Sequence, residues 1–232
     1  MIGGVCPGDV RVPFRFCHKP SPGGSCRTIS RLWPSHDTTR IGRAHSLPTV
    51  GAMVETESCS VRLRALVTKL IARCLLPLAA LRAPGRARWL ACQWAMGIRF
   101  PAEDLEGLSR SALAAFTTAR ADAFWRHGQL IGLTSGHRDA AEQHRLFTAE
   151  VRRTGSRSAA RRRVLPPDES AHVGGIAIDV RPTGGARWLE RHGHRYHLYR
   201  RYDNEWWHFE YRPEYDGQAP PRRPHPGAVA QP

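Results

Sequence analysis

Two short segments of the sequence combine histidine with acidic residues at spacings that suit a metal ion. In the first, S-A-H-V-G-G-I-A-I-D, His172 precedes Asp179, and the residues between them are small or aliphatic. Side chains alternate between the two faces of a strand, so a strand over 175–180 points its isoleucines and valine to the core and Asp179 to the other side. His172 then lies in the loop that enters the strand, where its imidazole can share a metal ion with the carboxylate.

The second segment, E-W-W-H-F-E, supplies a third ligand in His208. Three protein ligands and one open position are typical of a catalytic zinc site, whereas a structural zinc site is closed by four. Glu205 lies an odd number of positions before His208, so on a regular strand it would point away from the metal. Its participation requires the strand to begin after Glu205, with a bend that Asp203 and Asn204 favour. Glu210 either orients His208 through the second ring nitrogen or is a solvated strand residue, and we favour the solvated residue.

A third segment, S-G-H-R at 135–138, is typical of a turn between a strand and a helix. An arginine in such a turn, here Arg138, can bind a carboxylate or stabilise an oxyanion. Asp139 is placed to cap the helix that follows. Gln143 lies on that helix, and its position alone favours packing or support of a neighbouring residue.

Together these segments resemble the D-alanyl-D-alanine carboxypeptidase/dipeptidase family of zinc metallopeptidases, of the vancomycin-resistance peptidase type, whose core is shared with lysostaphin-type enzymes and the hedgehog domain. The family patterns S-G-Y-R, S-x-H-x-x-G-x-A-[IV]-D and E-x-x-H find their counterparts here in the same order, over about residues 100–215. The resemblance implies that His172, Asp179 and His208 hold one zinc ion per chain.

The same resemblance implies roles for four further residues. Glu205 would be the general base, and Arg138 would stabilise the transition state. Ser170 would help to hold the terminal carboxylate of the substrate, and Gln143 is a weaker match to a glutamine of the first helix. His137 stands where the family has tyrosine. That departure affects the expected substrate pocket and leaves the metal ligands unchanged.

The activity implied is that of a zinc-dependent D,D-carboxypeptidase acting on peptidoglycan stem peptides. A cell-wall endopeptidase or dipeptidase of the same family is an alternative, and so is a non-catalytic zinc-containing binding domain, against which Glu205 and Arg138 argue. The net charge of +15 raises nucleic-acid binding as another alternative. Aromatic residues do not alternate with the basic ones, so no nucleic acid is expected. The basic residues suit weak association with a membrane or an anionic wall, and the protein is expected to be a monomer.

The pattern of elements predicts an α+β fold, with a small, mostly antiparallel sheet and helices packed on one side. Helical spacing extends over 108–126, after Asp139 and over 186–192, with a short basic helix at 157–164. Strands are expected over 129–134, 175–180, 195–200 and 206–211. A zinc peptidase domain is therefore assigned to 94–215, followed by a loose Pro/Gly-rich tail at 216–232.

Residues 1–93 are expected to be a poorly structured N-terminal region. Within them 1–52 lack any sustained period, and one hypothesis is that the native chain starts at Met53. The basic and apolar stretch 61–81 is either a signal or anchor segment or an amphipathic surface helix. The protein would lie in the cell envelope in the first case and in the cytoplasm in the second. All six cysteines precede residue 93, so the predicted metal site contains no thiolate.

Overall fold

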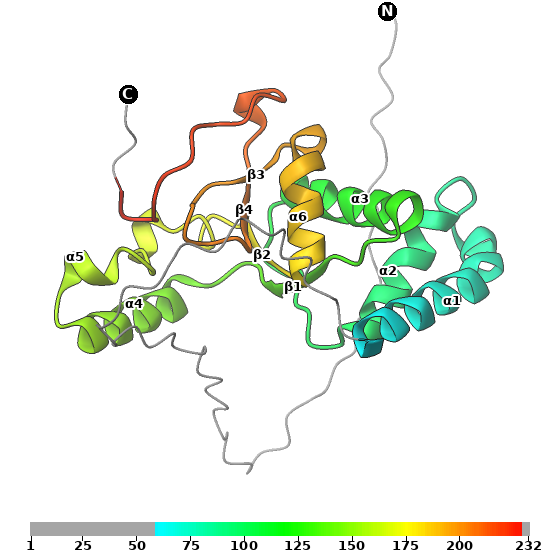
Figure 1. Cartoon of the computed structure of the whole chain (residues 1–232), viewed down its shortest axis with the longest axis horizontal. Coiled ribbons are helices and arrows are strands. Elements are labelled where there is room, and N and C mark those ends of the chain that lie inside the picture. The colour runs from blue at the N-terminus through cyan, green and yellow to red at the C-terminus, as the bar shows by residue number, and fades with distance from the viewer. Residues whose placement is uncertain (1–58, 229–232) are drawn as a thin grey trace, which may run out of the picture. The chain divides into compact units, whose positions relative to one another are not determined.

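The computed structural model describes residues 59–228, which form six α-helices and four strands (Figure 1). The predictions for residues 1–52, including a start at Met53, lie outside the described residues. The helices are α1 (Cys59–Arg82), α2 (Ala87–Arg99), α3 (Arg110–His127), α4 (Ala140–Thr154), α5 (Arg157–Ala160) and α6 (Thr183–His192). The strands are β1 (Gly132–Ser135), β2 (Ala177–Arg181), β3 (Leu198–Arg200) and β4 (His208–Tyr211).

The four strands form one antiparallel sheet in the order β1-β2-β4-β3. The two segments with the candidate ligands thus provide the two central strands, which pair directly with each other. The predicted α+β class is confirmed, and each predicted strand is present in a shorter form.

One face of the sheet packs against α3 and α6, which lie side by side in Figure 1. Ile178 and Val180 of β2 enter this core together with Phe209 of β4. On α3 the core residues Phe116, Ala119 and Ala123 repeat at helical spacing. Because strand side chains alternate, burying the aliphatic face of β2 and β4 directs their polar residues to the opposite face.

Helix ends follow the expected capping chemistry. The Asp139 carboxylate accepts the Glu142 amide at 2.7 Å, which confirms the predicted cap of α4. Ser109 caps α3 in the same way, and Gly128 ends that helix with a positive φ of 65°. The Asp139 cap directly follows the turn at 135–138, so it fixes where that turn ends and α4 begins.

The expectation that residues 1–93 are poorly structured is wrong for 59–93, which form α1 and most of α2. These helices pack against each other, and α2 packs against α3. A second apolar cluster includes Ala72 of α1, Cys92 of α2 and Phe124 of α3. The boundary expected at residue 94 therefore falls inside a helix that belongs to this cluster.

The stretch 61–81 lies within α1. None of the described helices combines the length and apolar character that crossing a bilayer requires. Cys74 on α1 is an exposed free thiol, and Cys92 is a buried one.

The tail beyond residue 216 contains no helix or strand in the part that the structure describes, up to residue 228. It is nevertheless held against the domain. Arg223 forms an isolated bridge with Tyr202, and its guanidinium donates to the Tyr202 hydroxyl at 2.9 Å.

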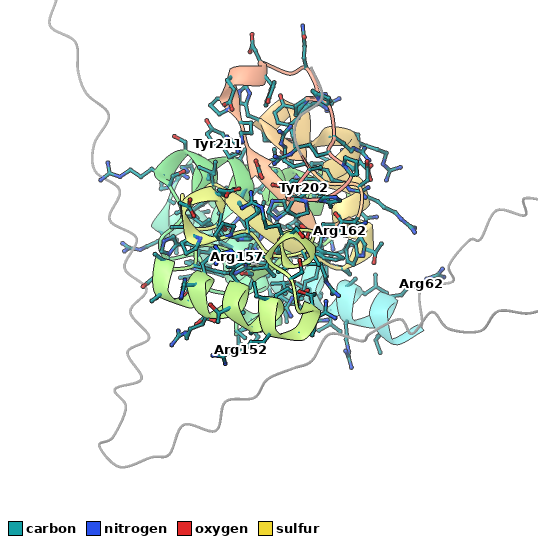
Figure 2. The ribbon with its side chains drawn as sticks, turned by 90° about the vertical axis from the view of Figure 1, so that its left-hand side faces the viewer. Arg62, Arg152, Arg157, Arg162, Tyr202 and Tyr211 are labelled. Carbon is teal, nitrogen blue, oxygen red and sulfur yellow. The ribbon has the colours of Figure 1, made fainter. Side chains whose placement is uncertain are left out.

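Arginines give the surface its basic character. Arg152, Arg157 and Arg162 are exposed and project from the side of the molecule formed by α4, α5 and the segment that follows (Figure 2).

Candidate metal centre

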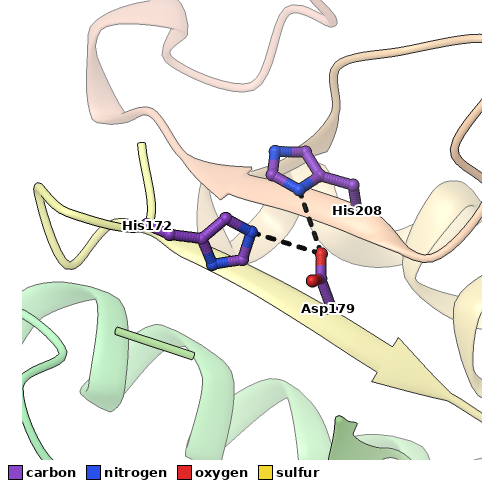
Figure 3. Close-up of side chains that lie close together, drawn as sticks. All are labelled: His172, Asp179 and His208. Atoms are coloured by element: carbon purple, nitrogen blue, oxygen red, sulfur yellow. Dashed lines mark hydrogen bonds and ion pairs between the residues drawn. The ribbon is translucent and has the colours of Figure 1, made fainter. Parts of the chain in front are cut away.

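His172, Asp179 and His208 meet on the polar face of the sheet, and all three are buried (Figure 3). Asp179 on β2 pairs in register with His208 on β4, and the turn before β2 brings in His172. One carboxylate oxygen of Asp179, Oδ1, lies 3.0 Å from Nδ1 of His208 and 3.4 Å from Nε2 of His172. One ligand atom from each residue lies within 4.8 Å of the others. The group could therefore hold a metal ion, and two imidazoles with one carboxylate suit zinc.

The orientation of His172 is fixed by a main-chain carbonyl. Its Nδ1 lies 2.6 Å from the oxygen of Gly136, and a carbonyl can only accept a hydrogen bond. Nδ1 therefore carries the proton, which leaves the lone pair of Nε2 for a metal. The Arg138 amide donates to the His172 carbonyl at 3.3 Å, so the turn at 135–138 and the turn of His172 are tied together.

His208 is fixed by a second carboxylate, that of Glu210. The His208 Nε2 lies 3.3 Å from Oε1 of Glu210, which also accepts the Tyr202 hydroxyl at 3.2 Å. Arg212 donates to the other oxygen of Glu210 at 2.8 Å. The preference for Glu210 as a solvated strand residue is wrong, because its exposed fraction is 0%. It instead orients His208, so that Nδ1 faces the site.

The charges of this group are strongly coupled. Burial opposes ionisation of Asp179, but the two histidines lower its pKa below the usual range. Burial would also lower the pKa of His208, but hydrogen bonds to Asp179 and Glu210 raise it to about 10. Burial lowers the pKa of His172. Without a metal, His208 is therefore protonated on both ring nitrogens and donates one proton to Asp179 and one to Glu210, and a cation at Nδ1 would replace the proton on that nitrogen.

Glu205 lies at the edge of the same group. It is buried in the turn before β4, with Oε2 4.0 Å from Nδ1 of His208. The strand begins at His208, so the bend that brings Glu205 to this side is confirmed. Burial raises the pKa of Glu205 to about 7, against the opposing effect of His208. A carboxyl group with such a pKa can exchange protons near neutral pH.

A bulge in β1 places Arg138 at the site. The register shifts between Leu133 and Ser135, so that Ser135 lies opposite Asp179. From the next turn the Arg138 Nη2 donates to Oδ2 of Asp179 at 2.9 Å, and Nε donates to the Ser135 hydroxyl at 3.0 Å. Arg138 thus holds the oxygen of Asp179 that faces away from the histidines.

Gln143 and Ser170 have different relations to the group. Gln143 is buried, donates to the Leu165 carbonyl at 2.7 Å and lies 3.4 Å from Nη1 of Arg138. It supports Arg138, as its position on α4 suggests. Ser170 is buried at the start of the turn that carries His172, and its carbonyl accepts the Val173 amide.

The turn of His172 is pressed against the loop before α3 at Gly175. The carbonyl of Gly175 accepts the Ser109 amide at 2.8 Å. A Cβ atom at Gly175 would lie 2.5 Å from the Gly107 carbonyl oxygen, and the φ of Gly175 is +65°. Both features require glycine at this position.

Two contributors escaped the sequence analysis. The Tyr202 ring stacks on His208, with centroids 5.0 Å apart, and the Gly136 carbonyl orients His172. No local pattern marks Tyr202, and the S-G-H-R segment does not show that its glycine carbonyl meets His172, because both contacts are tertiary. Glu210 did carry a signal, since it lies two positions after His208 on the same strand face.

No protein-family model matches the sequence, and no curated protein is found to be similar to it. Among solved structures, the chain is similar to the LD-carboxypeptidase LdcB, at 25% identity and a TM-score of 0.40, covering 45% of this chain and 58% of LdcB. The D,D-pentapeptidase VanY from a VanB-type resistance cassette, solved with Zn(II), is similar at 25% identity and a TM-score of 0.40, covering 47% of this chain and 76% of VanY.

The L,D-carboxypeptidase DacB from Streptococcus pneumoniae is similar at 26% identity and a TM-score of 0.39, covering 48% of this chain and 70% of DacB. The chain thus spans less than two thirds of the length of LdcB. With TM-scores near 0.4, a function has to be argued from the residues of this chain.

Proposed function

We propose that this protein is a zinc-dependent peptidase that acts on peptidoglycan stem peptides, and that it removes the last residue of a peptide ending in D-Ala-D-Ala. One observation carries this proposal. A buried carboxyl group, Glu205, lies at the edge of three converging ligands, with Oε2 4.0 Å from Nδ1 of His208. A purely structural metal site has no use for such a group, whereas hydrolysis needs a base beside the metal.

The residues divide the work as follows. His172 would offer Nε2, His208 Nδ1 and Asp179 Oδ1 to zinc, because their other polar atoms are already engaged. Zinc held there would polarise a peptide carbonyl and lower the pKa of water. Glu205 accepts a proton as water adds to the carbonyl carbon. It then returns that proton to the leaving amine as the C–N bond breaks, so the base is regenerated.

Arg138 serves the site in two ways. Its contacts with Asp179, Ser135 and Gln143 engage three N–H groups. A guanidinium has five such donors, so two stay available for a substrate oxygen. The side chain is 23% exposed, which lets it reach solvent while it holds Asp179. Ser170, at the start of the His172 turn, is proposed to meet the terminal carboxylate of the substrate.

The test is release of D-alanine from a synthetic stem pentapeptide by the zinc-loaded full chain. We expect release that a chelator stops and that added zinc restores. Glu205→Gln should lower kcat by about 10²–10⁴ while zinc still binds one per chain. Glu142→Gln, on the exposed surface of α4, is the matched control and should leave the rate unchanged.

The result that overturns the proposal is zinc-loaded, folded protein that releases no D-alanine. A parallel assay with the tetrapeptide, which ends in a single D-alanine, distinguishes an L,D-carboxypeptidase from a D,D-carboxypeptidase. Internal cleavage of cross-linked peptides would instead support the endopeptidase alternative, and binding without cleavage would support a binding domain.

A further inference from the structure

Helix α1 carries an apolar stripe that no described residue covers. Leu66 and Leu70 are each 61% exposed, and Leu81 is 83% exposed. Successive residues of an α-helix turn by about 100°, so the exposed apolar positions fall within a sector of roughly 120°. The exposed apolar side chains of this sector are Leu63, Leu66, Val67, Leu70, Leu78 and Leu81. Between Leu70 and Leu78 the sector is filled by Cys74 and Pro77, which are also exposed. Single exposed leucines are common on protein surfaces, but a row of this length along one helix is not.

The opposite side of α1 is already occupied. Thr68, Ala72 and Ala79 are buried, and they lie about 140–180° from the centre of the stripe. These small residues allow α1 to pack closely on α2, with Ala72 in the cluster shared with α2 and α3. The stripe is therefore a second apolar face, separate from the one that folding buries.

Basic residues flank the stripe on both sides. Viewed down the helix axis, the cations on one side lie about 80–120° from the centre of the stripe, and they are Arg62, Lys69 and Arg73. Those on the other side lie about 100° from it, and they are Arg64 and Arg82. Figure 2 shows Arg62 pointing away from the helix. The sequence of α1 contains no aspartate or glutamate. The long stems of arginine and lysine can lie along an apolar surface while their charges reach the polar layer above it.

We propose that α1 binds the surface of an anionic lipid bilayer, with the leucine stripe in the acyl boundary and the flanking cations at the phosphate layer. Helix α1 has an apolar sector and cationic borders, two features of interfacial helices, and no described helix is long and apolar enough to cross a bilayer. A second copy of α1 is a poorer partner, because the cationic residues beside its stripe would face those of the first copy and repel them. The helix contains no acidic residue that could pair with them. Each cation near such a surface adds to the attraction.

The experiment is sedimentation of the full chain with vesicles of phosphatidylcholine alone or mixed with phosphatidylglycerol. We expect binding to the mixed vesicles, weaker binding to the neutral ones, and loss of the difference at about 1 M salt, where the Debye length falls to about 3 Å. Leu70→Glu should lower the partition coefficient by at least about tenfold, because it places a charge in the middle of the stripe.

Leu146→Glu on α4 is the matched control, since Leu146 is also exposed and lies outside α1. It should bind as the unaltered chain does, and circular dichroism should show both variants folded. Equal binding by Leu70→Glu would overturn the proposal, because the attraction would then come from basic residues elsewhere. The proposal would also be overturned if the folded, unaltered chain did not bind anionic vesicles. The same holds if the unaltered chain does not bind vesicles but dimerises with rising concentration, and Leu70→Glu abolishes that dimerisation. None of these readouts depends on peptidase activity.

Discussion

The carboxylate of Glu210 offers the sharpest test of how the site is built, because it touches neither the metal position nor a substrate. It accepts hydrogen bonds from Nε2 of His208 at 3.3 Å, from the Tyr202 hydroxyl at 3.2 Å and from Nε of Arg212 at 2.8 Å. The exposed fraction of Glu210 is 0%. In Glu210→Gln one of the two acceptor oxygens becomes an NH₂ group, which faces donors that it cannot satisfy.

The magnitude follows from these contacts. Hydrogen bonds to charged groups contribute about 1.5–3 kcal/mol each. Arg212 is 32% exposed and can regain water, so its contribution is partly recovered. We therefore expect a loss of about 2–4 kcal/mol in the free energy of unfolding. Because His208 is no longer held with Nδ1 towards the site, zinc affinity should fall about 10–100-fold.

Zinc affinity is measured by competition with a chromophoric chelator, and stability by urea denaturation of the metal-free chain. Glu190→Gln is the matched control. Glu190 joins two arginines, Arg200 and Arg222, but it is 32% exposed on α6, whereas Glu210 is buried beside Arg212 and Arg201. Such a surface pair contributes about 0–1 kcal/mol, and its loss should leave zinc affinity unchanged. Wild-type zinc affinity in a folded Glu210→Gln variant would refute the idea that Glu210 orients His208.

Three other predictions concern proton transfer and the shape of the site. The pKa of Glu205 is about 7 without metal, and a bound cation would lower it towards its ordinary value of 4.5. We therefore expect kcat/KM to fall as the pH drops through a value between 7 and 4.5, where Glu205 becomes protonated. A kcat/KM profile that stays flat down to pH 4.5 would contradict the assignment of Glu205 as the base. At pH 7 zinc binding should release about one proton from His208, whose pKa is about 10, and about half a proton more from Glu205, whose pKa falls from about 7. Calorimetry in buffers of different ionisation enthalpy measures this release, and zero release would argue against both assignments. Gly175→Ala should destabilise the fold by about 1–3 kcal/mol in thermal denaturation because of its positive φ. Gly174→Ala, whose Cβ would meet nothing closer than 3.6 Å, should stay within about 0.5 kcal/mol, and equal melting of the two variants would show that the close approach at Gly175 is unimportant.

The ligand group could be predicted from the sequence because strand alternation is a local rule. Once β2 was known to bury Ile178 and Val180, Asp179 had to face the other way. The same rule required a bend before His208, and the strand does begin there. What joins the two segments in space is the pairing of β2 with β4, which local patterns do not determine.

The supporting contacts were not predictable in the same way. Arg138 reaches Asp179 only because β1 carries a bulge, and nothing in the S-G-H-R segment announces one. Tyr202 depends on the path of the chain between β3 and β4. Of the two alternatives for 61–81, the amphipathic surface helix corresponds to α1, whereas α2 was not expected. Basic residues and Pro77 interrupt the apolar pattern of α1, although the proline is accommodated within the helix.

The apolar cluster shared by α1, α2 and α3 determines how this protein can be divided. A fragment that starts at residue 94 would lose Ala72 and Cys92 and would expose Phe124 of α3 to water. A fragment that keeps this apolar surface covered therefore begins no later than α1. This holds whether the fragment is expressed alone, exchanged between proteins or released by a protease. The leucine stripe is then carried by the same folding unit as the metal site, so the two properties are inherited together.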